Sequence, residues 1–173
     1  MKFKGTTIGE EQKRGDITMK LTQEDIERSL SVFRVFAKAY RYISEHSILD
    51  SKRHGFNPSE FAVLEILYHK GPQILQQIGS RLLLVSGNMT YIADKLEKNG
   101  LIVREPSKTD RRAIYIKLTE KGYEVMDRIF PIHAEKIAQC FTSLTSEEQL
   151  MLKELLKKAG KHSEELLEKE KKS

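Results

Sequence analysis

The spacing of the apolar side chains changes at Gly100, and this change restricts the fold more than any other feature of the chain. Before Gly100, apolar residues recur at helical spacing in segments separated by helix-ending residues. After it, residues 101–104 and 113–118 have the short β-branched and aromatic pattern of strands, joined by a polar stretch at 106–112. Helical spacing returns after residue 118. The pattern therefore predicts a mostly α-helical (α+β) fold with one small β-hairpin.

Local signals predict three short helices before the hairpin. Asn57-Pro58-Ser59-Glu60 combines an N-cap residue, a proline in the first turn and an acid at the third position, so a helix is expected over 61–69. Two further helices are expected within 74–83 and 89–98, and Asn99-Gly100 ends the second of them. Two short helices followed by a hairpin with a long charged tip describe a winged helix-turn-helix.

Longer helices flank this central region. The first begins near Thr22 and has two apolar faces, one with Ile26, Leu30, Phe33, Ala37 and Tyr40, the other with Val32, Val35, Phe36, Ala39 and Ile43. A surface helix needs one apolar stripe, so two stripes predict packing against a second partner. After the hairpin, a helix runs towards Phe141 and Pro131 is expected to kink or interrupt it. Thr145-Ser146-Glu147-Glu148 is a capping box for a last helix with a leucine-rich stripe.

Positive charge gathers in the centre of the chain. The formal net charge is +5, and residues 81–121 alone contain nine Lys and Arg against five Asp and Glu. Residues 122–173 contain nine basic and ten acidic residues. This distribution permits binding of nucleic acid at the predicted helix-turn-helix and hairpin, without requiring it.

The helix that ends at Lys98 has the amphipathic pattern of a recognition helix. One face is apolar, and the other offers the groups that can reach base edges or phosphates in a major groove, namely Ser86, Asn88, Thr90, Tyr91 and Lys95. Any amphipathic surface helix also has a polar face, so a solvated surface remains the alternative for this helix taken alone.

The predicted hairpin tip strengthens the DNA-binding interpretation. It contains Lys108, Asp110, Arg111 and Arg112. A guanidinium on a protruding loop can enter a narrow minor groove, and a neighbouring carboxylate can hold its rotamer. Charged hairpin tips are also common as solvated turns, which is the alternative.

Three segments of the sequence resemble the MarR family of bacterial and archaeal transcription regulators: DKLEKNGLIVR at 94–104, DRR at 110–112 and LTEKG at 118–122. The resemblance covers residues 22–168 in element order. It implies a homodimeric repressor on a palindromic operator in double-stranded DNA, with Arg112 in the minor groove. It also implies a dimerisation helix (21–56), the winged helix-turn-helix (57–121) and C-terminal dimerisation helices (122–173). Residues 1–20 depart from the family's usual compact start, and because they have no apolar periodicity they are expected to be a flexible N-terminal extension.

Regulators of this family commonly release DNA when a small, often phenolic or anionic, ligand binds between the dimer helices and the winged region. The resemblance therefore makes an effector pocket a hypothesis, with Phe33, Phe36, Tyr40, His46 and Phe61 as lining residues. Aromatic residues at helical spacing are more commonly part of a core, which is the alternative interpretation.

Cys140 is the single cysteine of the chain. With one cysteine, the chain cannot form an internal disulfide. A redox-responsive regulator that uses Cys140 is one alternative function. No cluster of cationic residues in the sequence near Cys140 would lower its pKa, so a buried structural thiol is favoured.

Other classes of protein find little support in the sequence. There is no glycine-rich phosphate loop, nucleophile elbow or close pair of histidines, so we expect no enzyme, no cofactor and no metal site. The chain has no apolar run of the length needed to cross a membrane and no apolar signal-peptide core near its start, so a cytoplasmic protein is expected. A winged-helix adaptor that binds only proteins remains an alternative, although such an adaptor would not need the basic tip.

Overall fold

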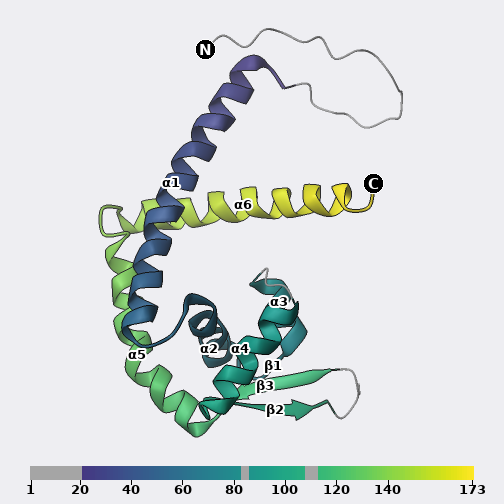
Figure 1. Cartoon of the computed structure of the whole chain (residues 1–173). Coiled ribbons are helices and arrows are strands. Elements are labelled where there is room, and N and C mark those ends of the chain that lie inside the picture. The colour runs from purple at the N-terminus through teal and green to yellow at the C-terminus, as the bar shows by residue number, and fades with distance from the viewer. Residues whose placement is uncertain (1–20, 83–85, 108–112) are drawn as a thin grey trace. The chain divides into compact units, whose positions relative to one another are not determined.

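The computed structural model describes residues 21–82, 86–107 and 113–173. Within these residues the chain is mostly helical with a small antiparallel sheet, as predicted (Figure 1). The elements in chain order are α1 (Gln23–Arg53), α2 (Pro58–Lys70), β1 (Gln73–Ile74), α3 (Leu75–Arg81), α4 (Ser86–Lys98), β2 (Ile102–Pro106), β3 (Ile114–Leu118), α5 (Glu120–Gln139) and α6 (Ser146–Glu170).

The chain divides into two units, residues 1–39 and residues 40–173. The first unit contains the N-terminal part of α1, and none of its described side chains is buried. The second unit contains the end of α1 and all later elements, including the whole core.

The predicted helix caps are present. Asn57 accepts a hydrogen bond from the backbone N–H of Glu60, and the Glu60 side chain accepts one from the backbone N–H of Asn57. Thr145 and Glu148 form the same reciprocal pair at the start of α6. Gly100 ends α4 with φ 71, a left-handed conformation that glycine adopts without a Cβ clash.

The sheet has the order β1-β3-β2, and both pairs are antiparallel. The predicted hairpin is confirmed, with Ile102 opposite Leu118 and Pro106 opposite Ile114. Strand β1 was not predicted. It contains two residues, Gln73 and Ile74, and a segment this short has no readable period.

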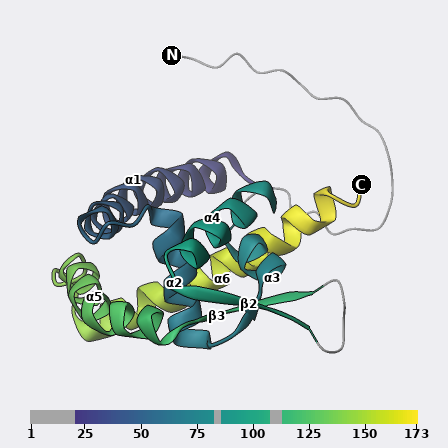
Figure 2. The ribbon, with the colours of Figure 1, turned by 60° about the horizontal axis from the view of Figure 1, so that its bottom comes forward.

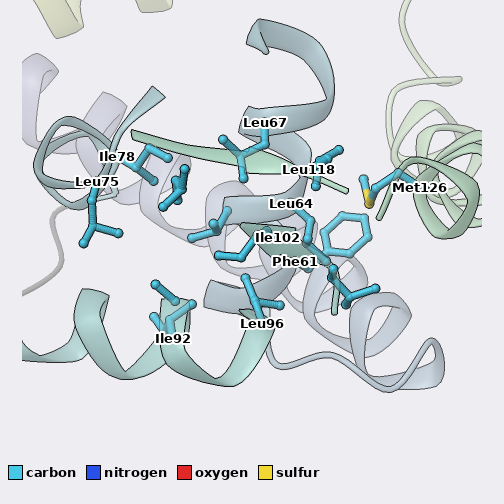
Figure 3. Close-up of a cluster of buried hydrophobic side chains, with 14 of the residues drawn as sticks. Phe61, Leu64, Leu67, Leu75, Ile78, Ile92, Leu96, Ile102, Leu118 and Met126 are labelled. Carbon is cyan, nitrogen blue, oxygen red and sulfur yellow. The ribbon is translucent and has the colours of Figure 1, made fainter. Parts of the chain in front are cut away.

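One hydrophobic core joins α2, α3, α4, the β2–β3 hairpin and α5. Figure 3 shows side chains from α2, α3, α4, the β2–β3 hairpin and α5 converging on the same volume. The buried apolar residues are Phe61, Val63, Leu64, Leu67, Leu75, Ile78, Met89, Ile92, Ala93, Leu96, Leu101, Ile102, Ile116, Leu118, Met126 and Ile129. The core therefore fixes the two short helices α3 and α4 relative to the hairpin.

A buried polar contact connects the end of α1 to α5. Asp50 Oδ2 lies 2.9 Å from His133 Nδ1, and both side chains are almost fully buried. The same carboxylate oxygen lies 3.7 Å from His54 Nε2. Because an unpaired carboxylate in this position would be costly, the contact fixes Asp50 on α5.

Helix α5 continues through Pro131 from Glu120 to Gln139, so of the two predicted effects the interruption is wrong, and a kink at Pro131 stays a prediction. A proline inside a helix removes one backbone hydrogen bond and clashes with the preceding turn. Met126 and Ile129 before Pro131, and His133 after it, are buried against the rest of the second unit. The packing of these side chains on both sides of Pro131 offsets the free energy that the proline costs the helix.

The junction between β3 and α5 holds the end of α4. The Thr119 hydroxyl donates to the carbonyl oxygen of Gly100 at 2.6 Å and accepts from the N–H of Gly122 at 3.0 Å. Lys121 Nζ donates to the carbonyl oxygen of Asn99 at 2.8 Å. A Cβ on residue 122 would overlap the carbonyl oxygen of Leu101. The start of α5 therefore packs directly on the end of α4, and Gly122 permits this close packing.

We predict that Gly122→Ala lowers the free energy of unfolding by about 1–3 kcal/mol, because the added methyl group meets backbone that cannot easily move. Gly87→Ala is the matched control, since a Cβ on residue 87 meets nothing within 4 Å. That control is expected to change stability by less than about 1 kcal/mol. Urea denaturation followed by circular dichroism measures both, and equal effects of the two substitutions would contradict the assignment.

Candidate nucleic-acid interface

Helix α4 is divided into a buried and an exposed side, as its sequence predicts. Its buried stripe consists of Met89, Ile92, Ala93 and Leu96, which enter the core. Of the five residues predicted to face DNA, Asn88, Thr90, Tyr91 and Lys95 are exposed, and Tyr91 has an exposed fraction of 66%. Ser86 is the first residue of α4, and its side chain lies outside the described part. The structure thus brings these positions together on one helix.

The pair α3 and α4 lies next to the hairpin. Figure 2 shows β2 and β3 side by side near α2 and α3, and α3 contacts both β3 and α4. The hairpin is described up to Ser107 on one side and from Ala113 on the other, where the N–H of Ser107 donates to the carbonyl oxygen of Ala113. The predicted tip residues Lys108, Asp110, Arg111 and Arg112 lie outside the described residues. The base of the wing is therefore in place beside the helix-turn-helix.

Arg104 on β2 fixes one flank of α4. Its Nη1 lies 2.6 Å from Asp94 Oδ1 and 3.1 Å from Glu97 Oε2. Its Nη2 donates to the carbonyl oxygen of Thr90 at 3.3 Å, and its backbone N–H donates to Glu97 at 3.2 Å. One guanidinium thus spans two turns of α4, and charge-assisted hydrogen bonds of this kind are the strong ones.

Lys95 fixes the other flank of α4. Its Nζ lies 2.6 Å from Oε1 of Glu60, the acid of the capping box at the start of α2. The Glu60 side chain is 2% exposed, whereas that of Lys95 is 45% exposed. The hydrogen bond to Glu60, together with the charge of its carboxylate, raises the pKa of Lys95 above its ordinary value. Lys95 was predicted to face DNA, and in this structure its ammonium group is bound to α2.

Comparison with known proteins assigns the chain to a family. Residues 56–114 match the model of the MarR family. Over 149 residues the chain is 59% identical to the uncharacterized HTH-type transcriptional regulator YkoM of Bacillus subtilis, covering 86% of this chain and 97% of that protein. The chain belongs to the MarR family.

Two further comparisons support the function of the chain. The chain is 49% identical over 134 residues to the HTH-type transcriptional regulator MhqR of Bacillus subtilis, covering 78% of this chain and 92% of MhqR. The structure resembles that of Sco3205 from Streptomyces coelicolor, a MarR-family regulator solved in complex with DNA, with a TM-score of 0.70 and 25% identity over 82% of this chain and 92% of that one. The MarR-family chain is therefore a DNA-binding transcriptional regulator, and the expectation that it is not an enzyme is confirmed by this membership.

The five residues of the hypothetical effector pocket fall in two settings. Phe61 is 2% exposed and belongs to the core, where its ring centroid lies 4.5 Å from that of His133. Phe33, Phe36, Tyr40 and His46 are exposed residues of α1. Phe61 therefore fits the alternative interpretation, in which the aromatic residue is part of the core. The four residues of α1 stay candidates for a ligand or a partner.

Cys140 directly follows α5 and is half-buried, with its thiol 3.5 Å from the carbonyl oxygen of Lys136.

Among the described residues, no group of three or more His, Cys, Asp and Glu side chains is arranged to hold a metal ion. No helix in the described part of the chain is long and apolar enough to cross a membrane.

Sequence reasoning missed the two side chains that hold α4 in place, Arg104 and Glu60. Arg104 was treated only as part of the family resemblance, although Asp94 and Glu97 precede it at spacings that put both acids on one side of the helix. Glu60 was treated only as a capping residue. Its burial follows from the packing of α2 against α4, which a linear sequence does not contain.

We predict that Arg104→Met lowers the free energy of unfolding by about 1–3 kcal/mol, because Met keeps the apolar stem and removes the charge-assisted hydrogen bonds. Lys117→Met is the control, since Lys117 pairs only with the exposed carboxylate of Glu105 among the described residues. That exposed pair is expected to contribute less than about 1 kcal/mol. Thermal or urea unfolding compares the two, and a control as destabilised as Arg104→Met would contradict the account.

Proposed function

We propose that this MarR-family regulator is a homodimeric repressor that binds a palindromic operator and releases it when a small aromatic or phenolic ligand binds. The exposed polar side of α4, held on a rigid core beside the base of a basic wing, is the observation that carries the DNA-binding part of this proposal. The resemblance to MarR regulators supports the remaining parts.

Helix α4 is proposed to enter the major groove. Ser86, Asn88, Thr90 and Tyr91 then offer hydroxyl and amide groups to base edges, and Lys95 is the fifth residue predicted for this surface. The wing residues Lys108, Asp110, Arg111 and Arg112 are proposed to follow the backbone into the neighbouring minor groove, with Arg112 inserted and Asp110 orienting it.

The dimer proposal is supported by large apolar side chains that are exposed on α1 and α6 among the described residues. Helix α6 has no buried residue over its whole length. Its exposed large apolar residues are Leu150, Met151, Leu152, Leu155, Leu156, Leu166 and Leu167. Those of α1 are Ile26, Leu30, Val32, Phe33, Val35, Phe36, Tyr40, Tyr42 and Leu49. Apolar surfaces of this extent are typical of protein interfaces, and two copies related by a twofold axis match a palindromic site.

Ligand-induced release needs a ligand that prefers a dimer whose two recognition helices no longer fit successive major grooves. We propose Phe33, Phe36, Tyr40 and His46 of α1, all exposed, as contacts of an aromatic ligand, because aromatic rings pack well against one another. Phe61 is the fifth residue of this proposal, and it is buried in the core.

Binding to duplex DNA tests the proposal. A duplex selected by the full-length protein from a random library, and the duplex upstream of its own gene, are titrated at several salt concentrations beside an unselected duplex. We expect the selected sequence to contain a palindrome, and the affinity to fall steeply with salt because Lys and Arg release counterions from phosphates. Equal affinity for selected and unselected duplexes would overturn sequence-specific binding.

We predict that removal of residues 145–173 abolishes the dimer and weakens binding to the palindromic duplex, while the remaining chain stays folded because no residue of α6 belongs to the buried core. Sedimentation equilibrium measures the assembly state. The milder variant Leu152→Ser/Leu155→Ser is expected to weaken the dimer. The matched control Lys158→Ser/Lys161→Ser, on the same helix, is expected to leave it intact. A truncated chain that remains dimeric would refute the interface.

A further inference from the structure

Helix α4 has ionic contacts on both flanks of its buried stripe. Successive residues of an α-helix are rotated by about 100°. This rotation places Lys95 on one flank, and Asp94 and Glu97 on the other. Tyr91 and Lys98 lie between the flanks, on the side away from the core, and both are exposed. The side proposed to face DNA is thus bounded by two ionic contacts.

The contact on the Lys95 flank starts from a buried carboxylate. Glu60 Oε1 lies 2.6 Å from Lys95 Nζ, while Glu60 Oε2 accepts the backbone N–H of Asn57 at 3.1 Å. Removal of the ammonium group would leave the buried carboxylate without a counter-charge, which is unfavourable. Lys95 is therefore held on Glu60 more strongly than a lysine on an open helix face would be.

The contact on the opposite flank prevents rotation in the other sense. Arg104 reaches from β2 to the carboxylates of Asp94 and Glu97. Its Nη2 also donates to the carbonyl oxygen of Thr90, one turn earlier, so the guanidinium is held at two points along α4. With α2 attached on one flank and β2 on the other, α4 has one preferred rotation about its own axis. Hydrogen bonds to base edges depend steeply on distance and angle, so this rotation matters for sequence recognition.

We propose that Lys95 is a positioning residue of the DNA-binding surface, which acts together with Glu60 by fixing the rotation of α4 and does not neutralise a DNA phosphate. The proposal rests on the proposed role of α4 as the recognition helix, and it reassigns one of the five residues predicted for that surface. Glu60, which is buried and cannot touch DNA, thereby becomes a determinant of sequence specificity.

The two roles of Lys95 predict different salt dependence. A lysine that neutralises a phosphate contributes about 0.9 to the slope of log affinity against log salt concentration, and its loss weakens binding to every sequence. A lysine that positions α4 contributes nothing to that slope. Its loss weakens binding to the selected sequence, where base contacts are made, and leaves binding to unselected DNA unchanged.

The test uses the full chain with Lys95→Met, Glu60→Gln and the double variant. Glutamine at residue 60 can still accept the N–H of Asn57, because Gln serves in a capping box as Glu does, so Glu60→Gln removes the ion pair and keeps the cap. Lys70→Met is the control. Lys70 is an exposed lysine at the end of α2, is not one of the residues proposed to face DNA, and has no ion pair among the described residues. Affinities for the selected and an unselected duplex are measured over a range of salt concentrations.

We expect Lys95→Met and Glu60→Gln each to lower the ratio of the two affinities roughly tenfold or more, the size of one lost base contact. The double variant should lose no more than either single variant, since both remove one interaction. The slope against salt should remain that of the unmodified protein for Lys95→Met. Lys70→Met should keep the affinity ratio.

The proposal is overturned if Glu60→Gln keeps the affinity ratio, or if Lys95→Met lowers the salt slope and weakens both duplexes equally. Thermal melting without DNA is recorded first. If a single variant is poorly folded, the double variant, in which both charges of the pair are absent, supplies the comparison. An unmodified protein that does not distinguish the duplexes would instead overturn the role of α4 itself, which separates the two failures.

Discussion

The structure depends on the burial of one side of α4 in a core shared by α2, α3, both hairpin strands and α5. Met89, Ile92, Ala93 and Leu96 provide that side, and each removes apolar surface from water. Burial alone is non-directional and leaves a helix able to adjust its rotation. The ionic contacts of Arg104 and Lys95 on the flanks, and the hydrogen bond from Thr119 to Gly100 at its end, supply the direction. The exposed side of α4 is thereby held in one orientation beside the wing.

Much of this arrangement could be predicted because it is encoded locally. The capping boxes at Asn57 and Thr145 involve residues three positions apart, and Gly100 ends α4 through its own backbone preference. The hairpin strands have a period that a short stretch of sequence shows, and the buried stripe of α4 follows from helical spacing. Each of these signals can be read without knowing where the rest of the chain lies.

The features that escaped prediction depend on contacts between distant parts of the chain. Strand β1 exists because Gln73 and Ile74 pair with β3, more than 40 residues later. Glu60 is buried because α4 packs against α2, and this packing places Lys95 Nζ 2.6 Å from Glu60 Oε1. Pro131 was expected to kink or interrupt α5, and tertiary packing keeps the helix continuous. The sequence shows Gly122 only as part of a family motif. A glycine is needed there because a Cβ would overlap the carbonyl oxygen of Leu101.

The central claim is that α4 reads the major groove twice, once from each subunit. Dimethyl sulfate footprinting of the selected duplex measures this directly, because it methylates guanine N7 in the major groove and adenine N3 in the minor groove. The account predicts two groups of protected guanine N7 atoms whose centres lie about one helical turn apart, with adenine N3 protection beside them where the wings lie. Protection confined to the minor groove, or a single protected major-groove segment, would contradict it.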